Sequence, residues 1–104
     1  MLDDYDFVAK ICEKARISMP TIDDNAIVNM FIILSEFTDR EQYIIKQRVR
    51  YGNTQKIVGK ALGISAQSIG YAERKIYRKL RHPSRVKILT GKANTADAVT
   101  SSGI

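Results

Sequence analysis

The side chains best suited to chemistry lie on one face of a helix expected after Ser65. This face carries amides and hydroxyls first and cations afterwards, in the order Gln67, Ser68, Gly70, Tyr71, Arg74, Lys75 and Arg78. Amides and hydroxyls can hydrogen-bond to base edges, whereas cations bind phosphates. The order therefore suits a helix that enters the major groove of DNA with its N-terminus first.

Two residues on this face have alternative interpretations. Gly70 either permits close approach of the backbone to DNA or is an exposed position that tolerates glycine, at a cost of about 1 kcal/mol relative to alanine. Tyr71 contacts a thymine methyl group or a phosphate, or is a surface aromatic residue without a ligand.

Charge is divided unevenly along the chain, although its total is only +6. Residues 1–37 hold three basic and seven acidic groups, a net charge of −4. Residues 38–85 hold twelve basic and three acidic groups, a net charge of +9. A segment this basic is typical of a nucleic-acid-binding surface. A solvated basic face without a ligand is the alternative that charge alone leaves open.

Several function classes are not expected. No nucleophile–base set, carboxylate pair or phosphate loop is discernible, so we predict no enzyme and no cofactor. Cys12 is the only cysteine and is predicted to be a small core residue; His82 is the only histidine and is predicted to act near a helix C-terminus rather than on a metal. The acidic N-terminus is no signal peptide, and the apolar run 31–34 is far shorter than the roughly 20 residues that span a bilayer. We therefore expect a cytoplasmic protein that does not contact the membrane.

Five helices are predicted, and no alternating run indicates a strand. The first covers about 4–16. The second covers about 24–36 and is apolar on more than one face, so it is either central to the domain or part of an interface. The third runs to about residue 51 and starts with a capping box at Thr38 and Glu41. The candidate partner-binding residues lie on the second helix and are Phe31, Ile32 and Leu34.

The last two predicted helices fit a helix-turn-helix, because a short helix is joined to a longer one by the three-residue turn 63–65. The shorter, from about residue 54 to 62, is expected to bury Ile57, Val58, Ala61 and Leu62. Gly63 suits its C-terminus, Ser65 caps the longer helix, and Pro83 ends that helix. The predicted fold is thus an all-α, five-helix domain, with an N-terminal helical pair over 1–37, a helix-turn-helix part over 38–85 and a flexible tail over 86–104.

Residues 37–85 resemble region 4 of the bacterial housekeeping sigma factor family. The resemblance opens with Phe37-Thr38-Asp39-Arg40-Glu41, which is similar to the family's Leu-Thr-x-Arg-Glu start. It closes with the octet Arg78-Lys79-Leu80-Arg81-His82-Pro83-Ser84-Arg85. LuxR-type response-regulator domains share the opening but not the octet, so the octet decides between the two families. In sigma factors, this module reads the promoter −35 element.

The helix face described above and the resemblance together predict which residues contact DNA. Those facing bases are Ala66, Gln67, Ser68, Gly70 and Tyr71. Those facing phosphates are Arg40, Arg48, Thr54, Gln55, Ser65, Arg74, Lys75 and Arg78. The family usually has Arg or Glu at the first two base-facing positions, 66 and 67, and Arg and Gln at 70 and 71. Because this chain departs from that pattern, the standard −35 hexamer is not predicted.

The resemblance also implies protein partners besides double-stranded DNA. In the family, the counterpart of the predicted helix that starts at Thr38, together with its neighbouring helices, binds a hydrophobic helix of the RNA polymerase β subunit called the flap tip. The apolar second helix is consistent with such a partner or with a second copy of this chain, giving a homodimer through the N-terminal helices. No counterpart of sigma region 2 is present. We expect one half of a split sigma factor, or a stand-alone regulator from a phage or mobile element, rather than an excised domain.

The predicted function is a non-enzymatic transcription regulator of sigma region 4 type that acts at promoters together with RNA polymerase. Two other classes remain open. One is a DNA-binding subunit for packaging or recombination, which uses the same motif without polymerase. The other is a polymerase-binding decoy or appropriator that has lost specific recognition of DNA sequence.

Overall fold

The computed structural model describes residues 1–91, which form six α-helices and one π-helical turn. These elements are α1 (Asp4–Ala15), α2 (Asp24–Leu34), α3 (Asp39–Ile45), η1 (Lys46–Arg50), α4 (Gln55–Leu62), α5 (Ala66–Leu80) and α6 (Pro83–Thr90). No strand occurs among the described residues, and the predicted all-α class is confirmed. No helix within residues 1–91 has both the length and the apolar character needed to cross a membrane.

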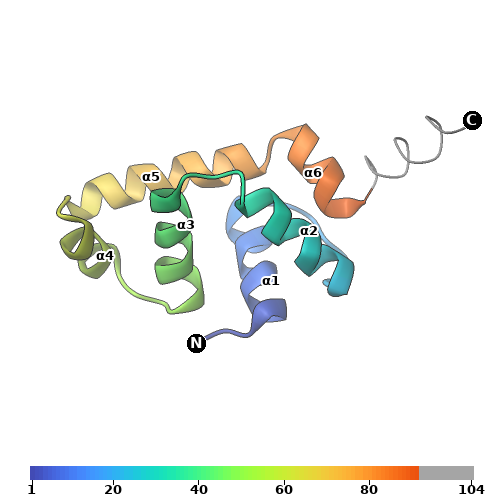
Figure 1. The fold of residues 1–104 in the computed structure, drawn as a ribbon, viewed down its shortest axis with the longest axis horizontal. Helices are drawn as coiled ribbons and strands as arrows, with labels where there is room; N and C mark the ends of the chain where they lie inside the picture. The colour runs from blue at the N-terminus through green and yellow to red at the C-terminus, as the bar shows by residue number, and fades with distance from the viewer. Residues whose placement is uncertain (92–104) are drawn as a thin grey trace, which may run out of the picture.

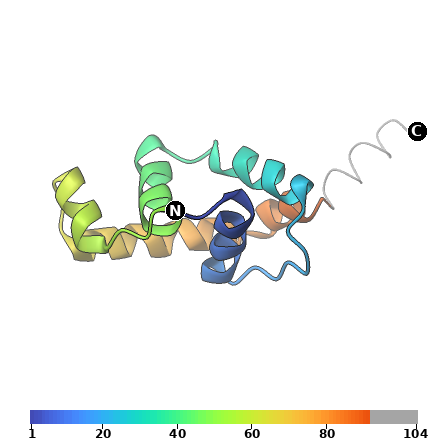
Figure 2. The same ribbon diagram turned by 90° about the horizontal axis from the view of Figure 1, so that it is seen from below.

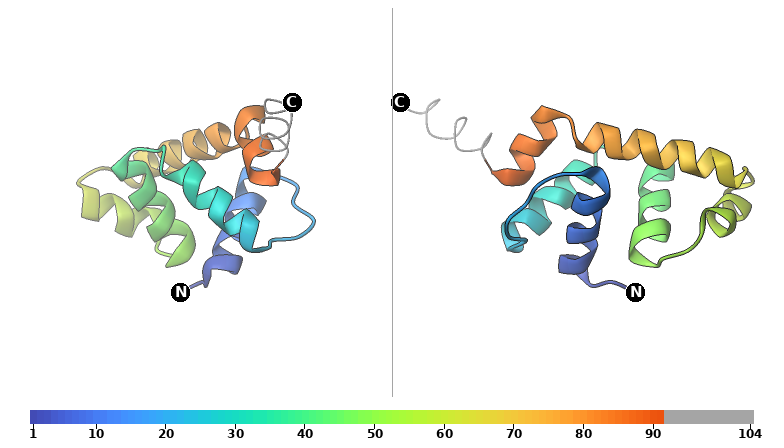
Figure 3. Two further views of the ribbon diagram at one scale, coloured as in Figure 1. Left: turned by 45° about the vertical axis from the view of Figure 1, so that its right-hand side comes forward. Right: turned by 180° about the vertical axis from the view of Figure 1, so that it is seen from behind.

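Helix α5 is the long element on which the others are arranged. Figure 1 shows it running along one side of the molecule, with α4 packed near its N-terminal end and α3 and α1 packed farther along it. Helix α6 follows α5 and pairs with α2. Figure 2, seen from below, and Figure 3, seen from two further sides, place α4 and α6 at opposite ends of α5. Helix α4 and the turn that joins it to α5 therefore lie at the end of the molecule away from α2 and α6.

One hydrophobic core joins the N-terminal helical pair to the helix-turn-helix part. Val8 and Ile11 from α1, Ile44 from α3, and Ile69 and Ile76 from α5 are fully buried in it. Burying large aliphatic side chains of this kind stabilises a fold by about 1.5–3 kcal/mol each. Residues 1–37 are thus integrated into the same core as α5 and are not an independently packed unit.

The predicted helix starts are confirmed by the capping contacts. The Glu41 amide donates to Thr38 Oγ1 (3.1 Å), and the Thr38 amide donates to Glu41 Oε1 (3.0 Å), which completes the capping box at α3. Thr54 caps α4 and Ser65 caps α5 in the same way, each through its hydroxyl oxygen. These caps satisfy backbone amides that have no partner inside their helices.

The third helix does not continue as a regular α-helix to residue 51. It widens into the π-helical turn η1, where the Tyr51 amide donates to the Lys46 carbonyl (3.2 Å). From this turn Arg50 reaches α1, with Nη1 donating to the Leu2 carbonyl (3.0 Å) and Nη2 to Asp4 Oδ1 (2.9 Å). The turn thereby fixes the start of α1 against the helix-turn-helix part.

The prediction of a flexible tail from residue 86 is wrong for residues 86–91. Pro83 follows the end of α5, as predicted, but it also begins α6, because proline suits the first position of a helix. His82 is the N-cap of α6, and its ring nitrogen accepts from the Ser84 amide (3.2 Å). Leu89 is buried in the core, and Asn29 Nδ2 donates to its carbonyl (3.4 Å). Residues 92–104 of the predicted tail lie outside the described residues.

The predicted burial of α4 is only partly correct. Val58 is buried and Leu62 is half-buried, but Ala61 is exposed and Ile57 is 54% exposed. The eight-residue α4 lies at the end of the molecule and packs mainly against α5, so only one narrow stripe of it is covered. The apolar residues on its other side have no helix to pack against among residues 1–91.

Candidate nucleic-acid interface

The helix-turn-helix geometry depends on a tight turn between α4 and α5. Gly63 ends α4 with a φ of 73°, a left-handed conformation that favours glycine, and the Ile64 amide donates to the Gly59 carbonyl (2.9 Å). Gly59 touches the turn so closely that a Cβ there would lie 2.6 Å from the Ile64 carbonyl oxygen. Two glycines therefore set the crossing of the two helices.

The N-terminal end of α5 presents most of the predicted base-facing residues to solvent. Gln67, Ser68 and Tyr71 are exposed, and Ala66 is half-buried. Gln67 Nε2 lies 3.3 Å from the Tyr71 hydroxyl and donates to it, which links the two side chains on one face of the helix. Three polar side chains are thus available for base edges.

Gly70 is not part of this exposed surface. It is buried, and a Cβ at this position would lie 3.3 Å from Gln55 Nε2. The side chain of Gln55 covers the helix at this point, so a larger residue would compete with Gln55 for the space. Packing between α4 and α5, which neither of the two interpretations of Gly70 included, therefore favours a small residue here.

The predicted phosphate-facing residues divide into three groups: exposed cations, capping hydroxyls, and two side chains directed inwards. Four cations are exposed and form no ion pair within residues 1–91: Arg40, Arg74, Lys75 and Arg78. The Arg74 guanidinium also lies 4.7 Å from the centre of the Tyr71 ring. The hydroxyls of Thr54 and Ser65 sit at the starts of α4 and α5 and accept from helix amides there.

Arg48 and Gln55 are directed inwards, towards Glu73 on α5. Glu73 is only 5% exposed; Arg48 Nε lies 2.7 Å and Gln55 Nε2 3.1 Å from its Oε1. Arg48 Nη1 also donates to the Asn53 carbonyl (2.7 Å). These contacts tie η1 and the start of α4 to α5. Arg48 and Gln55 therefore position the helix-turn-helix, and their placement does not favour a direct phosphate contact.

Tyr77 completes the environment of Glu73. Its hydroxyl donates to Glu73 Oε2 (3.2 Å), so both carboxylate oxygens have donors. Burial raises the pKa of Tyr77 well above its usual range, and the neighbouring Glu73 charge adds to the shift. Tyr77 therefore remains a neutral hydrogen-bond donor.

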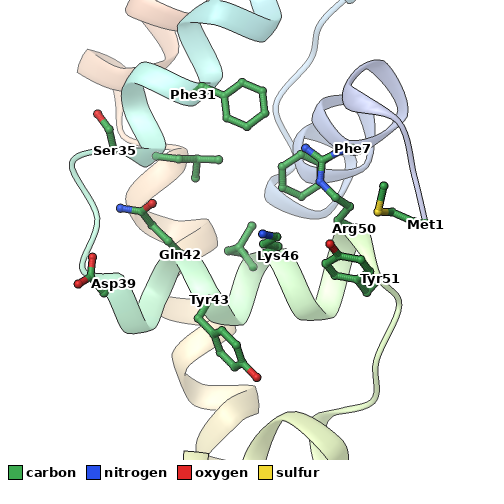
Figure 4. A pocket seen from close by; sticks show the side chains of 12 residues that line it. Met1, Phe7, Phe31, Ser35, Asp39, Gln42, Tyr43, Lys46, Arg50 and Tyr51 are labelled. Atoms are coloured by element: carbon green, nitrogen blue, oxygen red, sulfur yellow. The ribbon is translucent and has the colours of Figure 1, made fainter. Parts of the chain in front are cut away.

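A separate groove of about 570 Å³ opens between α1, α2, α3 and η1. Figure 4 shows the rings of Phe7 and Phe31 near one end, with Tyr43 and Tyr51 farther along. Phe31 is 39% exposed, and its ring centre lies 6.2 Å from that of Phe7. Of the predicted partner-binding residues, Phe31 and Leu34 line this groove, whereas Ile32 is exposed outside it.

Sequence reasoning missed several residues of these surfaces. Phe7, Tyr43 and Tyr51 line the groove together with Phe31, but they come from three different elements, and no spacing in the sequence connects them. Lys14 and Arg16, at the end of α1, lie in one depression with Arg74 and Arg78. The left-handed backbone at Arg16 (φ 59°) marks this position only once the structure is known.

Cys12 and His82, which were assigned to no binding site, both have structural roles. Cys12 is buried in the core, as predicted, and burial raises its pKa to about 11. His82 caps α6, as described above. No group of three or more histidine, cysteine or carboxylate side chains within residues 1–91 is arranged to hold a metal ion.

Comparison with known proteins covers the same part of the chain. The family model for sigma-70, region 4 matches residues 33–82, from the end of α2 through α5. The RNA polymerase sigma factor SigA of Listeria monocytogenes serovar 1/2a and that of Listeria innocua serovar 6a are each 40% identical to this chain over 63 residues. The match takes in 55% of this chain and 16% of each relative, so the chain corresponds to a small part of their length. No solved structure matched. Residues 33–82 of this chain are a sigma-70 region 4 domain, a DNA-binding domain of the transcription machinery.

Proposed function

We propose that the chain is a transcription regulator that binds promoter-like DNA through α4 and α5 and RNA polymerase through the groove at Phe31, in the cytoplasm of a bacterium or of a phage-infected host. The observation that carries the proposal is the presence of two chemically different surfaces. The exposed face of α5 is polar and cationic, while the groove contains aromatic side chains. None of the residues lining the groove belongs to α4 or α5, so both surfaces can be occupied together.

The DNA arm of the proposal rests on the order of side chains along α5. Gln67, Ser68 and Tyr71 occupy the N-terminal turns, where a recognition helix meets base edges. Arg74, Lys75 and Arg78 follow along α5 and bind phosphates on either side of the DNA major groove. Arg40, at the start of α3, supplies a further exposed cation.

The polymerase arm rests on the shape and lining of the groove. The floor of the groove includes the largely buried side chains of Leu34 and Ile45. Tyr51, which is 44% exposed, also lines it. Asp39 and Lys46 add polar groups among the residues that line the groove. An apolar groove between helices, with polar groups at its edge, is typical of sites that bind a single amphipathic helix. The polymerase β flap tip is a hydrophobic helix, as the sigma resemblance implies, and would present its apolar side chains to this groove.

Binding of a purified β flap fragment to the full chain tests the polymerase arm. Phe31→Glu places a charge in the groove and should weaken binding at least tenfold. Ile57→Glu is the matched control, because Ile57 is an exposed isoleucine on α4, outside the groove. Equal binding by both variants and the wild type would remove the groove from the polymerase site.

A second copy of this chain is the other occupant proposed for the α2 surface. Sedimentation of the purified chain distinguishes the two. A monomer that binds the flap fragment supports polymerase, and a dimer that Ile32→Glu dissociates supports self-association. Ile32 is 52% exposed and outside the groove, so its substitution leaves the groove lining intact.

The decoy function remains a second candidate because of one observation. Gly70 is covered by Gln55 and Ala66 is half-buried, so the base-facing surface is smaller than the family pattern implies. A decoy requires the groove but not sequence-specific DNA binding. The packaging or recombination alternative requires DNA binding but not the groove.

A further inference from the structure

A second depression, of about 250 Å³, lies between the end of α1 and the C-terminal half of α5. Its lining residues are five cations and one tyrosine: Lys14, Arg16, Arg74, Tyr77, Arg78 and Arg81. We call the five cations the α1–α5 cation cluster. Two of them come from α1 and its C-cap, which lie outside the residues matched by the region 4 family.

No acidic side chain within residues 1–91 forms an ion pair with the cluster. None of the five cations forms an ion pair within residues 1–91, and all five are exposed. The nearest acids in sequence are engaged elsewhere: Glu13 pairs with Lys10 (3.2 Å) and Glu73 with Arg48 (2.7 Å). Like charges brought together without a counter-ion repel one another, so the arrangement favours binding of an anion.

The backbone at Arg16 provides a second observation. Arg16 is the one non-glycine residue within 1–91 that has a positive φ, at 59°, and it ends α1 where glycine is the usual residue. A strained position occupied by arginine suggests that the side chain itself is required. Arg81 Nη1 donates to the neighbouring Ala15 carbonyl (3.4 Å), which places α5 beside this turn.

We infer that the α1–α5 cation cluster binds DNA backbone phosphates beyond the bases contacted by the N-terminus of α5, which makes α1 part of the DNA interface. The inference rests on the proposed function. Gln67, Tyr71, Arg74 and Arg78 follow one another at the three- and four-residue spacing of a single helix face. The cluster therefore continues the base-facing surface.

Helix dimensions place the cluster over the DNA backbone. At a rise of about 1.5 Å per residue, Arg78 lies about 16 Å along the axis from Gln67. The major groove of B-DNA is about 12 Å wide. A helix whose first turn is in the groove therefore has Arg78, and with it Lys14 and Arg16, at the flanking phosphate strand. Guanidinium groups suit this role because they bind phosphate in a bidentate manner.

The salt dependence of DNA binding by the full chain tests the inference, with a duplex that the wild-type chain selects from a random pool. Lys14→Gln and Arg16→Gly should each lower the slope of log K against log salt by about 0.9, and the double variant by about 1.8. Lys87→Gln is the matched control: it removes one exposed cation from α6, away from the cluster, and should leave the slope unchanged.

Two further measurements separate binding from folding and from sequence recognition. Arg16→Gly should leave the melting temperature unchanged or raised, because glycine suits the left-handed backbone at this position. Its loss of affinity should be equal for the selected duplex and for a random one, since phosphate contacts carry no sequence information.

The possible failures are distinguishable. If the wild type binds the duplex and the double variant keeps the wild-type slope, the cluster is not a phosphate site and the proposed function stands. If the double variant keeps that slope but no longer binds RNA polymerase, the cluster serves a protein partner and the inference is wrong. If the wild-type chain binds no duplex at all, both the inference and the DNA arm of the proposed function are overturned.

Discussion

Helices α1 and α4 both pack against α5, but different contacts hold them there. Helix α1 is held mainly by apolar packing, with Val8, Ile11 and Ala15 fully buried. Helix α4 buries only Val58 and Gly59 and half-buries Leu62. Its position depends on the Gln55–Glu73 hydrogen bond and on the close approach of Gly59 to the turn.

This difference shows how a small domain can attach a helix-turn-helix to a stable core. The apolar contacts of α1 tolerate variation in detail, because well-packed aliphatic residues can be exchanged at modest cost. The polar contacts of α4 have strict geometry, and a buried carboxylate that loses a partner is costly. A single substitution among the polar contacts that hold α4 should therefore lower the stability of the helix-turn-helix more than a volume-conserving substitution among the apolar contacts of α1.

The largest expected effect is that of Arg48→Ala, which removes the ion-pair partner of Glu73. We expect the free energy of unfolding to fall by about 3 kcal/mol, since breaking a buried pair leaves an uncompensated charge. Arg40→Ala is the control and should change stability by less than about 0.5 kcal/mol. Urea unfolding measures both.

The same two variants test the revised role of Arg48. In DNA binding, Arg40→Ala should lower the salt slope by about 0.9, whereas Arg48→Ala, measured where it is folded, should leave the slope unchanged. A stable Arg48→Ala protein with a reduced slope would restore Arg48 to the phosphate-facing group.

The second effect concerns the turn between α4 and α5. Gly59→Ala should destabilise the protein by about 2 to 3 kcal/mol, because its Cβ would lie 2.6 Å from the Ile64 carbonyl oxygen, which belongs to the backbone. Gly70→Ala is the comparison: its Cβ would meet the side chain of Gln55 at 3.3 Å, and the cost of shifting that flexible side chain is offset by about 1 kcal/mol of helix propensity, so a smaller loss is expected. Thermal unfolding should separate them clearly, and equal losses would contradict the packing assigned to Gly59.

The third prediction concerns sequence recognition by Gln67. A glutamine amide can pair with adenine, whereas glutamate accepts from cytosine, so Gln67→Glu should shift the preferred base from adenine to cytosine. The expected discrimination is about 1–3 kcal/mol at one base pair. Selection from a random DNA pool measures it for both proteins. Identical motifs, or none from either protein, would remove Gln67 from the base contacts and favour the decoy function.

The smallest effect is expected at the contact between α3 and α5, where Lys79 Nζ lies 2.8 Å from Glu41 Oε2. Burial alone would raise the pKa of Glu41, but Lys79 and the Thr38 amide together lower it below its usual value. A lowered pKa stabilises the fold above the pKa of the unfolded chain, and this stabilisation is lost as pH falls through the folded value.

Glu41→Gln tests this contact without removing the capping box, which glutamine can also form. At pH 7 we expect a loss of about 0.5 kcal/mol, reduced because Lys79 is partly exposed and screened by solvent. The difference from wild type should disappear under acid conditions below the folded pKa. Urea titrations at both pH values provide the measurement, and a difference that persists in acid would assign it to packing.

Local signals in the sequence predicted much of the fold and part of the site. Thr38 with Glu41, Thr54, and Ser65 each mark a helix start because a capping hydroxyl acts within three residues of itself. The exposed face of α5, apart from the buried Gly70, followed from helical periodicity. The structure agrees on these points because they depend on neighbours in the chain.

Features that depend on distant residues were not predictable in this way. The Arg48–Glu73 pair joins residues that are far apart in sequence, and the π-helical turn that presents Arg48 has no local signature. Pro83 correctly indicated the end of α5. Helix α6 is stabilised by the burial of Leu89 and by packing against α2, and these tertiary contacts have no local signal in the sequence. The exposure of Ile57 likewise reflects the absence of a neighbouring helix at that end of the described chain.

Formation of a ternary complex tests the central claim most directly, namely that one small chain holds DNA and RNA polymerase at separate surfaces. The selected duplex is bound to the full chain, and the β flap fragment is then added in a gel-shift titration. The account predicts a slower-migrating complex with wild type, and with Phe31→Glu a DNA complex that the fragment no longer shifts. Release of the duplex when the fragment is added to wild type would contradict it, because the two partners would then compete for one surface.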